Sequence, residues 1–261
     1  MNGAIVKSRE EIEIMDRANR IIRTVLADLR ARIAPGMTTL DIDRFAEERI
    51  REAGGEPAFK GYPAPGGGTE FPGTVCASVN DEIVHGVPSA DVVLRDGDIV
   101  SVDLGILWKG YYGDAAETYP VGRVSGEAAE LLRVTREALH LGVEQARGGN
   151  RVSDIGHAVQ AHVEAHRFSV VRDFVGHGIG SRLHEEPQIP NFGPPGRGAR
   201  LTEGMVLAIE PMVAAGSPEV TVSASDGWTA RTRDGSLSAH FELSVAVTAD
   251  GPWVLGGPRD A

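Results

Sequence analysis

The sequence predicts an α+β domain made of two related halves. Three observations indicate this class. In each half, two predicted helices precede a group of strands, and a short motif of the first half recurs in the second. The length of 261 residues and the hydrophobic content of 41% suffice for one large core. We therefore expect a single catalytic domain over residues 1–261, with an N-terminal half at about 1–125 and a C-terminal half at about 126–261.

The N-terminal half begins with two helical patterns. Apolar residues at helical spacing predict a helix over 8–32, and a second helix follows a turn, with Thr38 or Thr39 as its N-cap and Gly54-Gly55 as its stop. Residues 61–73, rich in Gly and Pro, predict a loop. Short strands are then expected at 74–80, 82–88 and 98–108.

The C-terminal half repeats this order. Helical spacing predicts helices within 125–149 and 152–167. Strands return after residue 168, and we expect them around "FVGHGIG", "GMVLAIEPMV", "WTARTRDG" and "HFELSVAV".

One motif relates the two halves directly. "LRDGDIVSVD" at 94–103 and "LTEGMVLAIE" at 201–210 share leucine, an acidic residue, glycine, a run of aliphatic residues and a final carboxylate at the same positions. In duplicated halves, Asp103 and Glu210 would occupy equivalent places and face a shared centre. The alternative is a chance likeness between two turns that enter strands.

Composition excludes several classes of function. The formal net charge is −11 without a Lys/Arg-rich run, which argues against a nucleic-acid surface. No stretch of 18 or more apolar residues predicts a membrane helix, and the charged N-terminus does not resemble a signal peptide. The single cysteine, Cys76, excludes an intramolecular disulfide. We expect a cytoplasmic monomer without nucleic-acid or membrane partners.

Acidic residues inside apolar segments point to a site. Glu210 lies in "GMVLAIEPMV", which predicts a buried strand, and an unpaired buried carboxylate costs several kcal/mol. Asp103 ends another apolar strand, and a hairpin turn at residues 108–110 would bring Asp114 within a residue or two of it. Opposed carboxylates repel each other unless one is protonated or a cation lies between them.

The second half adds further candidates. "FVGHGIGSRLHEEP" places His177 and His184 among glycines, and Glu242 lies in an apolar strand, with His240 two residues earlier on the same face if that strand is regular. The combined set is four carboxylates and one imidazole, namely Asp103, Asp114, His177, Glu210 and Glu242.

This ligand set predicts a hydrolytic metal centre. It contains no thiolate, which argues against a closed structural zinc site. Two divalent ions would roughly neutralise the four carboxylates, and the ligand types suit Mn²⁺, Fe²⁺, Co²⁺ or Zn²⁺ without deciding among them. A pair of carboxyl groups sharing a proton without metal is the alternative.

The longer strings resemble a known family. "NDEIVHGVP", "DGDIVSVDLGILWKGYYGDAAETYPVG", "GHGIGSRLHEEP", "GMVLAIEPM" and "DGWTARTRDGSLSAHFELSVAVT" are similar to the type I methionine aminopeptidases of bacteria, from about residue 5 to 256. The resemblance implies the pita-bread (creatinase/aminopeptidase-like) fold, in which two halves related by a pseudo-two-fold axis surround a central curved antiparallel sheet.

The resemblance also implies roles for the ligands. Asp103 would chelate one metal, Asp114 and Glu242 would bridge two metals, and His177 and Glu210 would bind the other. The implied reaction is removal of the initiator methionine from nascent chains with a small second residue, by attack of metal-activated water on the first peptide bond. The implied partners are the N-termini of nascent polypeptides, with transient contact to the ribosome.

Three residues of the matched strings would assist the reaction. Glu210 would shuttle the proton as a general base, His184 would hydrogen-bond the substrate carbonyl or the developing oxyanion, and His85 would contact the peptide nitrogen. A narrow pocket for methionine would have His85 at its edge and would be formed by Phe71, Cys76, Leu183 and Trp228. From physical arguments alone, Cys76 and Leu183 are ordinary core residues.

Departures from the family pattern keep other functions open. The loop 61–70 is longer and richer in glycine, with an aromatic residue replaced around Gly68, while His240 and Leu243 replace a usual Gln and His beside Glu242. These changes would alter the hydrogen bonding around a bridging ligand. The alternatives are an Xaa-Pro-type pita-bread metallopeptidase, a catalytically weak paralogue that acts as a peptide-binding module, and creatinase-like chemistry without metals.

Overall fold

The computed structural model describes residues 5–64 and 67–258, so residues 65–66 of the predicted Gly/Pro-rich loop lie outside it. Within the described part of the chain, none of the helices is both long and apolar enough to span a bilayer. The four expected helices are present as α1 (Arg9–Arg30), α2 (Thr39–Glu52), α3 (Gly126–Glu144) and α4 (Val152–Ala165).

Local capping explains where these helices begin. The Ser8 hydroxyl accepts a hydrogen bond from the backbone N–H of Glu11, and the Ser8 backbone N–H donates to the Glu11 carboxylate, which makes a capping box at the start of α1. Thr38 and Asp41 do the same for α2, so Thr38 is the N-cap and Thr39 is the first helical residue. The Ser125 hydroxyl caps α3.

Fifteen strands are present in the part of the chain that the structure describes. They are β1 (Glu56–Pro57), β2 (Val75–Val79), β3 (Glu82–Val84), β4 (Ile99–Trp108), β5 (Tyr111–Pro120), β6 (Ser169–Val170), β7 (Gly176–Gly178), β8 (Glu185–Ile189), β9 (Val206–Ile209), β10 (Met212–Ala214), β11 (Val220–Val222), β12 (Ala230–Thr232), β13 (Ser238–His240), β14 (Glu242–Thr248) and β15 (Gly251–Val254). The strands named from the sequence are all found, although two of them are interrupted.

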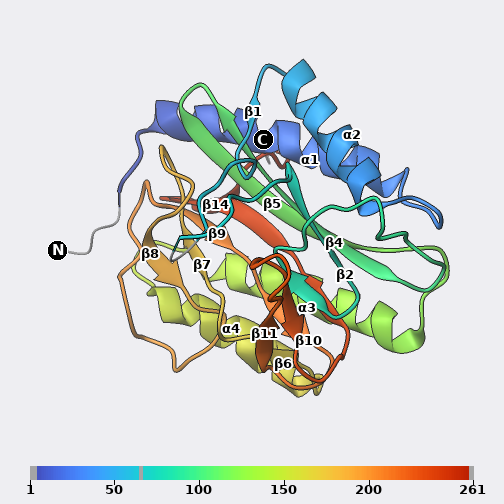
Figure 1. The fold of residues 1–261 in the computed structure, drawn as a ribbon. Helices are drawn as coiled ribbons and strands as arrows, with labels where there is room; N and C mark the ends of the chain where they lie inside the picture. Colours follow the sequence, from blue (N-terminus) through green and yellow to red (C-terminus); the bar gives the residue numbers. More distant parts are fainter. Residues whose placement is uncertain (1–4, 65–66, 259–261) are drawn as a thin grey trace.

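The main sheet is antiparallel, and each half of the chain supplies two of its central strands. Its order is β1-β4-β5-β14-β9-β7-β8, with β2 also paired to β4 and β15 to β14 (Figure 1). The N-terminal half supplies β4 and β5, the C-terminal half supplies β14 and β9, and the two halves meet where β5 pairs with β14. This arrangement agrees with the duplication predicted from the repeated motif. Two three-stranded sheets, β13-β10-β6 and β11-β12-β3, complete the strands.

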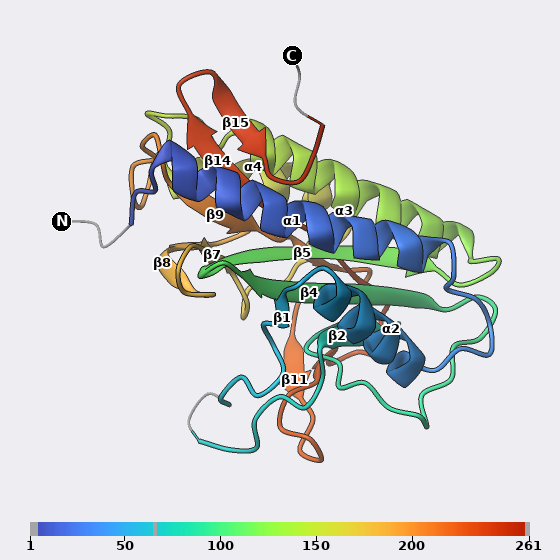
Figure 2. The same cartoon turned by 90° about the horizontal axis from the view of Figure 1, so that it is seen from above.

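Helices cover one face of the sheet, and the opposite face carries the candidate ligands. Figure 2 shows α1 and α3 on one side of β4 and β5, with β11 on the other. Alternate residues of β4, such as Val102 and Leu104, pack into the same buried cluster as α1 and α2. Because side chains alternate along a strand, Asp103 projects from the other face.

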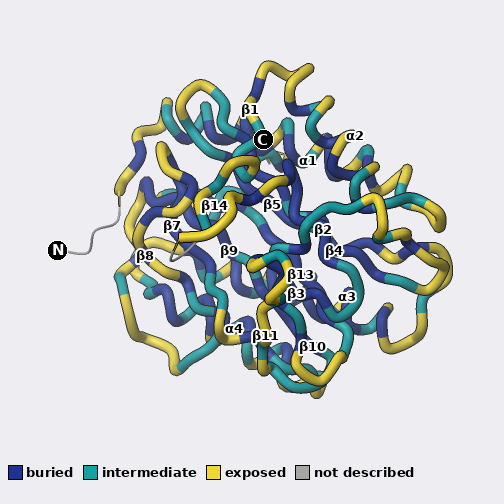
Figure 3. Tube along the Cα trace, viewed as in Figure 1, coloured by how far each residue is buried: buried dark blue, intermediate teal, exposed yellow. Residues whose placement is uncertain are grey.

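Each half has its own helix-to-sheet core. The larger cluster joins α3 and α4 to β9 and β14, and the second joins α1 and α2 to β2, β4 and β5. Figure 3 shows buried residues along the central strands and exposed residues in the outer loops.

The prediction of one continuous buried strand over "GMVLAIEPMV" was wrong. β9 ends at Ile209 and β10 begins at Met212 in a different sheet. Pro211 has no N–H to donate to a ladder, so the strand breaks there. The carbonyl of Glu210 instead accepts a hydrogen bond from the side-chain amide of Asn191 at 3.0 Å. The stretch "HFELSVAV" is also interrupted, at Phe241, where β13 ends and β14 begins in a different sheet.

Candidate active site

One cavity of about 490 Å³ gathers every residue predicted for the site. Its walls come from β4, β5, β7 and β14 and from the loops beside them. The predicted residues that line it are Phe71, Cys76, His85, Asp103, Asp114, His177, Leu183, His184, Glu210, Trp228 and Glu242. Residues separated by more than a hundred positions in the chain therefore share one enclosed space.

The hairpin between β4 and β5 determines the relative positions of the carboxylates of Asp103 and Asp114. Lys109 and Gly110 both adopt left-handed backbone angles, with φ of 51° and 83°, as a two-residue type I′ turn requires. The resulting register pairs Asp103 with Ala116 and Asp114 with Gly105. The two carboxylates thus lie two residues apart on the same face, within the distance that the sequence predicted.

β14 and β7 bring the remaining groups to this face. Glu242 pairs with Ala116 from the opposite side to Asp103, so one small residue separates the two acidic side chains. His177 Nε2 lies 3.9 Å from Asp114 Oδ2 and 3.5 Å from Glu210 Oε1. Ligand atoms of Asp114, His177 and Glu242 all lie within 4.8 Å of one another.

The tautomer of His177 suits a metal ligand. Its Nδ1 lies 2.9 Å from the carbonyl oxygen of Gly178. Because a carbonyl only accepts hydrogen bonds, Nδ1 carries the proton and Nε2 keeps a free lone pair. That lone pair faces the carboxylates, as it does in histidines whose orientation toward a metal is fixed by a second hydrogen bond.

Unsatisfied oxygen atoms provide a test of whether this cluster fits a metal. Among the described residues, the buried atoms Asp103 Oδ1, Asp114 Oδ1 and Glu242 Oε1 have no hydrogen-bond partner. Orphaned buried oxygens on several acidic groups are costly unless a cation satisfies them. The residues therefore fit divalent metal, the group that their chemistry predicts.

The burial of the cluster shifts its protonation. Burial raises the pKa of Asp103 to about 7. Burial, followed by repulsion from neighbouring carboxylates, holds the pKa values of Asp114, Glu210 and Glu242 well above the ordinary range. Burial and the neighbouring His184 lower the pKa of His177 to about 4, so its imidazole is neutral at pH 7. The carboxylates need nearby positive charge to stay ionised together.

A second histidine borders the cluster. The ring of His184 lies 4.3 Å, centroid to centroid, from that of His177, and burial lowers the pKa of His184. Its Nδ1 lies 2.7 Å from the hydroxyl of Tyr62, which also lines the cavity. Tyr62 was not predicted as a site residue, because it lies in the aperiodic loop. No local pattern in that loop distinguishes Tyr62 from an ordinary loop residue.

Aromatic residues form the apolar end of the cavity. Phe71, Cys76 and Trp228 pack into one buried cluster, and the Phe71 and Trp228 rings meet edge to face at 5.2 Å. His85 stands beside Trp228, with 6.1 Å between ring centroids, and has a strained φ of 60°. Leu183 belongs to a different cluster, at the start of α1, although it also reaches the cavity. Sequence reasoning missed Phe59, Phe174 and Met212 among the lining residues.

The two departures beside Glu242 differ in position. His240 lines the cavity, and its Nε2 lies 3.7 Å from Glu210 Oε2. Burial and His85 lower the pKa of His240 to about 3, so it is a neutral neighbour of Glu210. Leu243 instead packs against the core of the C-terminal half. Only the first change therefore faces the acidic cluster.

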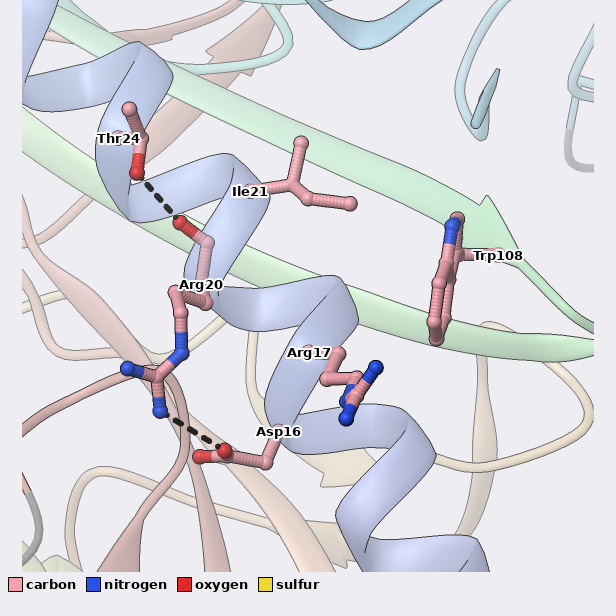
Figure 4. A pocket seen from close by; sticks show the side chains of 6 residues that line it. All are labelled: Asp16, Arg17, Arg20, Ile21, Thr24 and Trp108. Atoms are coloured by element: carbon pink, nitrogen blue, oxygen red, sulfur yellow. Dashed lines mark hydrogen bonds and ion pairs between the residues drawn. The ribbon is translucent and has the colours of Figure 1, made fainter. Parts of the chain in front are cut away.

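A second hollow lies outside this region. It is bordered by α1 and the end of β4 and contains Asp16, Arg17, Arg20, Ile21, Thr24 and Trp108 (Figure 4). Arg20 and Asp16 form an ion pair of 3.1 Å there. None of the residues predicted for the site lies in this hollow.

Comparison with known proteins agrees with this geometry. Residues 13–249 match the model of metallopeptidase family M24. A methionine aminopeptidase of Clostridium acetobutylicum is 49% identical over 251 residues, which are 96% of this chain and 98% of that protein. The structure of methionine aminopeptidase from Thermotoga maritima is 45% identical, has a TM-score of 0.93, and covers 98% of this chain and 100% of its own.

A more distant structure shares only the fold. Prolidase from Pyrococcus furiosus is 24% identical with a TM-score of 0.76, and this chain covers 66% of its length. The pita-bread α+β fold expected from the sequence is confirmed by these likenesses. The chain belongs to metallopeptidase family M24 and, within it, to the methionine aminopeptidases.

Proposed function

We propose that this enzyme removes the N-terminal methionine from nascent polypeptides whose second residue is small. The observation that carries the proposal is the position of the buried acidic cluster beside an aromatic pocket in one cavity. The acidic end suits the free amine and first peptide bond of a chain, and the apolar end suits an unbranched thioether side chain.

Two divalent ions, Mn²⁺, Fe²⁺, Co²⁺ or Zn²⁺, fit the acidic end. Asp103, Asp114, His177, Glu210 and Glu242 would hold them, with Asp114 and Glu242 shared between the two. Such ions would supply an activated water and a polarised carbonyl when bound. The orphaned oxygens of three of these carboxylates support this assignment.

Glu210 is the proposed proton carrier. It lies where β9 ends, and Asn191 holds its backbone carbonyl, so its side chain is aimed into the cavity from a fixed point. Burial, with repulsion from Asp103, raises the pKa of Glu210, and a carboxylate with a raised pKa accepts a proton more readily, as a general base must. Glu210 would take a proton from the attacking water and pass it to the leaving amine.

Two histidines would bind the reacting peptide bond. With Tyr62 donating to Nδ1 of His184, the proton of His184 lies on Nε2, which can donate to the substrate carbonyl oxygen. His85 lies at the other side of the cavity, and burial lowers its pKa to about 4. A neutral His85 can hydrogen-bond the peptide nitrogen without repelling the cations nearby.

The pocket for the methionine side chain would be formed by Phe71, Cys76, Leu183 and Trp228. The edge-to-face rings and the buried thiol give a soft apolar wall that suits a flexible thioether. We further propose that residues 1–261 act as one catalytic domain, because both halves supply side chains to one cavity. A cytoplasmic monomer is also proposed, and the free, buried Cys76 suits a reducing compartment.

Peptide hydrolysis tests this function. Met-Ala-Ser, Met-Pro and Ala-Pro peptides would be incubated with the metal-loaded enzyme, and the products identified by mass. We expect release of methionine from Met-Ala-Ser. Cleavage of Ala-Pro without release of methionine would move the assignment to an Xaa-Pro peptidase. Metal binding without hydrolysis of any peptide would indicate a peptide-binding module.

A further inference from the structure

A buried ion pair ties the segment before α1 to the back of the active site. Lys7 Nζ lies 2.6 Å from Glu185 Oε2, and only 3% and 0% of the two side chains are exposed. The residues are 178 positions apart. Neither Lys7 nor Glu185 lines the cavity, and neither has a role in the proposed reaction.

The pair is anchored at both ends. Lys7 Nζ also donates to the carbonyl of Ile5 at 2.9 Å, and the Lys7 backbone donates to that of Gly204 at 2.8 Å. The second oxygen of Glu185 accepts a hydrogen bond from the backbone N–H of Arg182 at 3.1 Å. A Cβ atom on Gly180 would overlap with both charged side chains, so the packing here leaves no spare room.

The segment that this pair holds carries two cavity residues. Residues 180–184 belong to the connection between β7 and β8, and they include Leu183 and His184. Leu183 packs in one buried cluster with Ile12 and Met15 of α1. His184 precedes Glu185 directly, so any movement of the Glu185 backbone moves the imidazole that faces the reaction.

We propose that the Lys7–Glu185 ion pair is a positioning device that fixes residues 180–184 and so orients His184 toward the substrate carbonyl. The physical reason is the cost of a buried unpaired charge. If Lys7 loses its charge, Glu185 must find water, and the simplest route is for the loop to move outward. This inference rests on the proposed function of His184, but the ion pair itself acts only through the loop.

The test compares Lys7→Met and Glu185→Gln with the double variant Lys7→Met/Glu185→Gln. We expect kcat for Met-Ala-Ser to fall roughly tenfold in each single variant, with KM changing less than about threefold, because His184 would act in the transition state. The double variant, which leaves no buried charge unpaired, should recover most of the lost kcat.

A second readout needs neither metal nor activity. Arg182 is exposed in the loop, and Arg197 is exposed in a separate loop. In Lys7→Met, trypsin should cut after Arg182 faster than in the wild-type chain, while the rate at Arg197 stays unchanged. Mass analysis of the fragments separates the two sites.

Ile50→Ala is the matched control for lost stability, because Ile50 is fully buried in α2 and belongs to a different cluster. It should lower Tm while keeping kcat within about twofold of the wild type. If Lys7→Met lowers kcat no more than Ile50→Ala does, or leaves cleavage at Arg182 unchanged, the positioning role is wrong. A wild-type enzyme that does not release methionine would instead contradict the proposed function.

Discussion

The hydroxyl of Tyr62 lies 2.7 Å from Nδ1 of His184, although the two residues belong to loops 122 positions apart. The rings meet edge to face, with 5.4 Å between their centroids. A loop without any periodic pattern thus supplies a hydrogen bond to one of the imidazoles of the active site. The contact assigns a function to that loop which its sequence does not reveal.

Replacing Tyr62 with Phe should lower kcat for Met-Ala-Ser by roughly 3- to 10-fold, the worth of about one hydrogen bond. Without the hydroxyl, His184 loses the hydrogen-bond partner of Nδ1, which in the proposed tautomer keeps the proton on Nε2. Steady-state kinetics check the result. Tyr119→Phe is the control, because Tyr119 donates to the carbonyl of Leu26 away from the cavity. Equal losses of kcat in the two variants would contradict the assignment.

Glu210→Gln should reduce kcat by roughly 10²- to 10⁴-fold, the usual contribution of a positioned proton-transfer group. Glutamine has nearly the same shape but cannot carry the proton. Single-turnover release of methionine would measure the loss. Glu203→Gln, a change at an exposed position, should leave the rate unaltered. A Glu210→Gln enzyme with wild-type kcat would exclude Glu210 as the base.

Removal of metal should abolish hydrolysis and lower Tm. Without cations, the buried carboxylates repel one another in the folded state. Because the metal binds only the folded protein, it stabilises that state, and its removal should lower Tm. Titration with Mn²⁺ after chelation should restore both properties, as followed by thermal unfolding and methionine release. Asp114→Asn should weaken Mn²⁺ binding by at least about tenfold, because Asp114 is one of the proposed metal ligands and lies in the buried group that could hold an ion. The matched change Asp250→Asn, at an exposed turn, should bind as the wild type does.

Trp228→Ala should raise KM for Met-Ala-Ser by roughly tenfold while kcat changes less. The substitution removes the ring that closes the apolar end against Phe71. Trp108→Ala, at the far end of β4, provides the control for loss of a tryptophan. An unchanged KM in the Trp228 variant would show that the methionine side chain binds elsewhere.

Asp43→Ala should lower the free energy of unfolding by about 2–4 kcal/mol. One carboxylate oxygen of Asp43 accepts hydrogen bonds from the backbone of Thr74 at 2.6 Å and of Val75 at 3.0 Å. Alanine would leave both buried N–H groups unpaired at the start of β2. Urea denaturation measures the loss, and Asp91→Ala, at an exposed position, should stay within about 0.5 kcal/mol of the wild type. Equal losses would show that the two hydrogen bonds contribute nothing.

Local patterns were sufficient to predict much of this protein. Helical spacing and capping residues located the four helices, and Lys109-Gly110 marked the hairpin that sets Asp103 against Asp114. The repeated motif pointed to a symmetric sheet. Carboxylates in apolar strands could be identified as candidate ligands because burial of an unpaired charge is costly at any position.

Contacts between distant segments could only be decided by the tertiary structure. The break at Glu210, the hydrogen bond from Tyr62 and the ion pair between Lys7 and Glu185 each depend on how loops pack onto the sheet. No periodicity encodes such contacts, since they join residues with unrelated local conformations. Local patterns thus indicated the helices, the strands and the residue types of the candidate site, while packing between distant segments fixed the distances that bring these residues into one cavity.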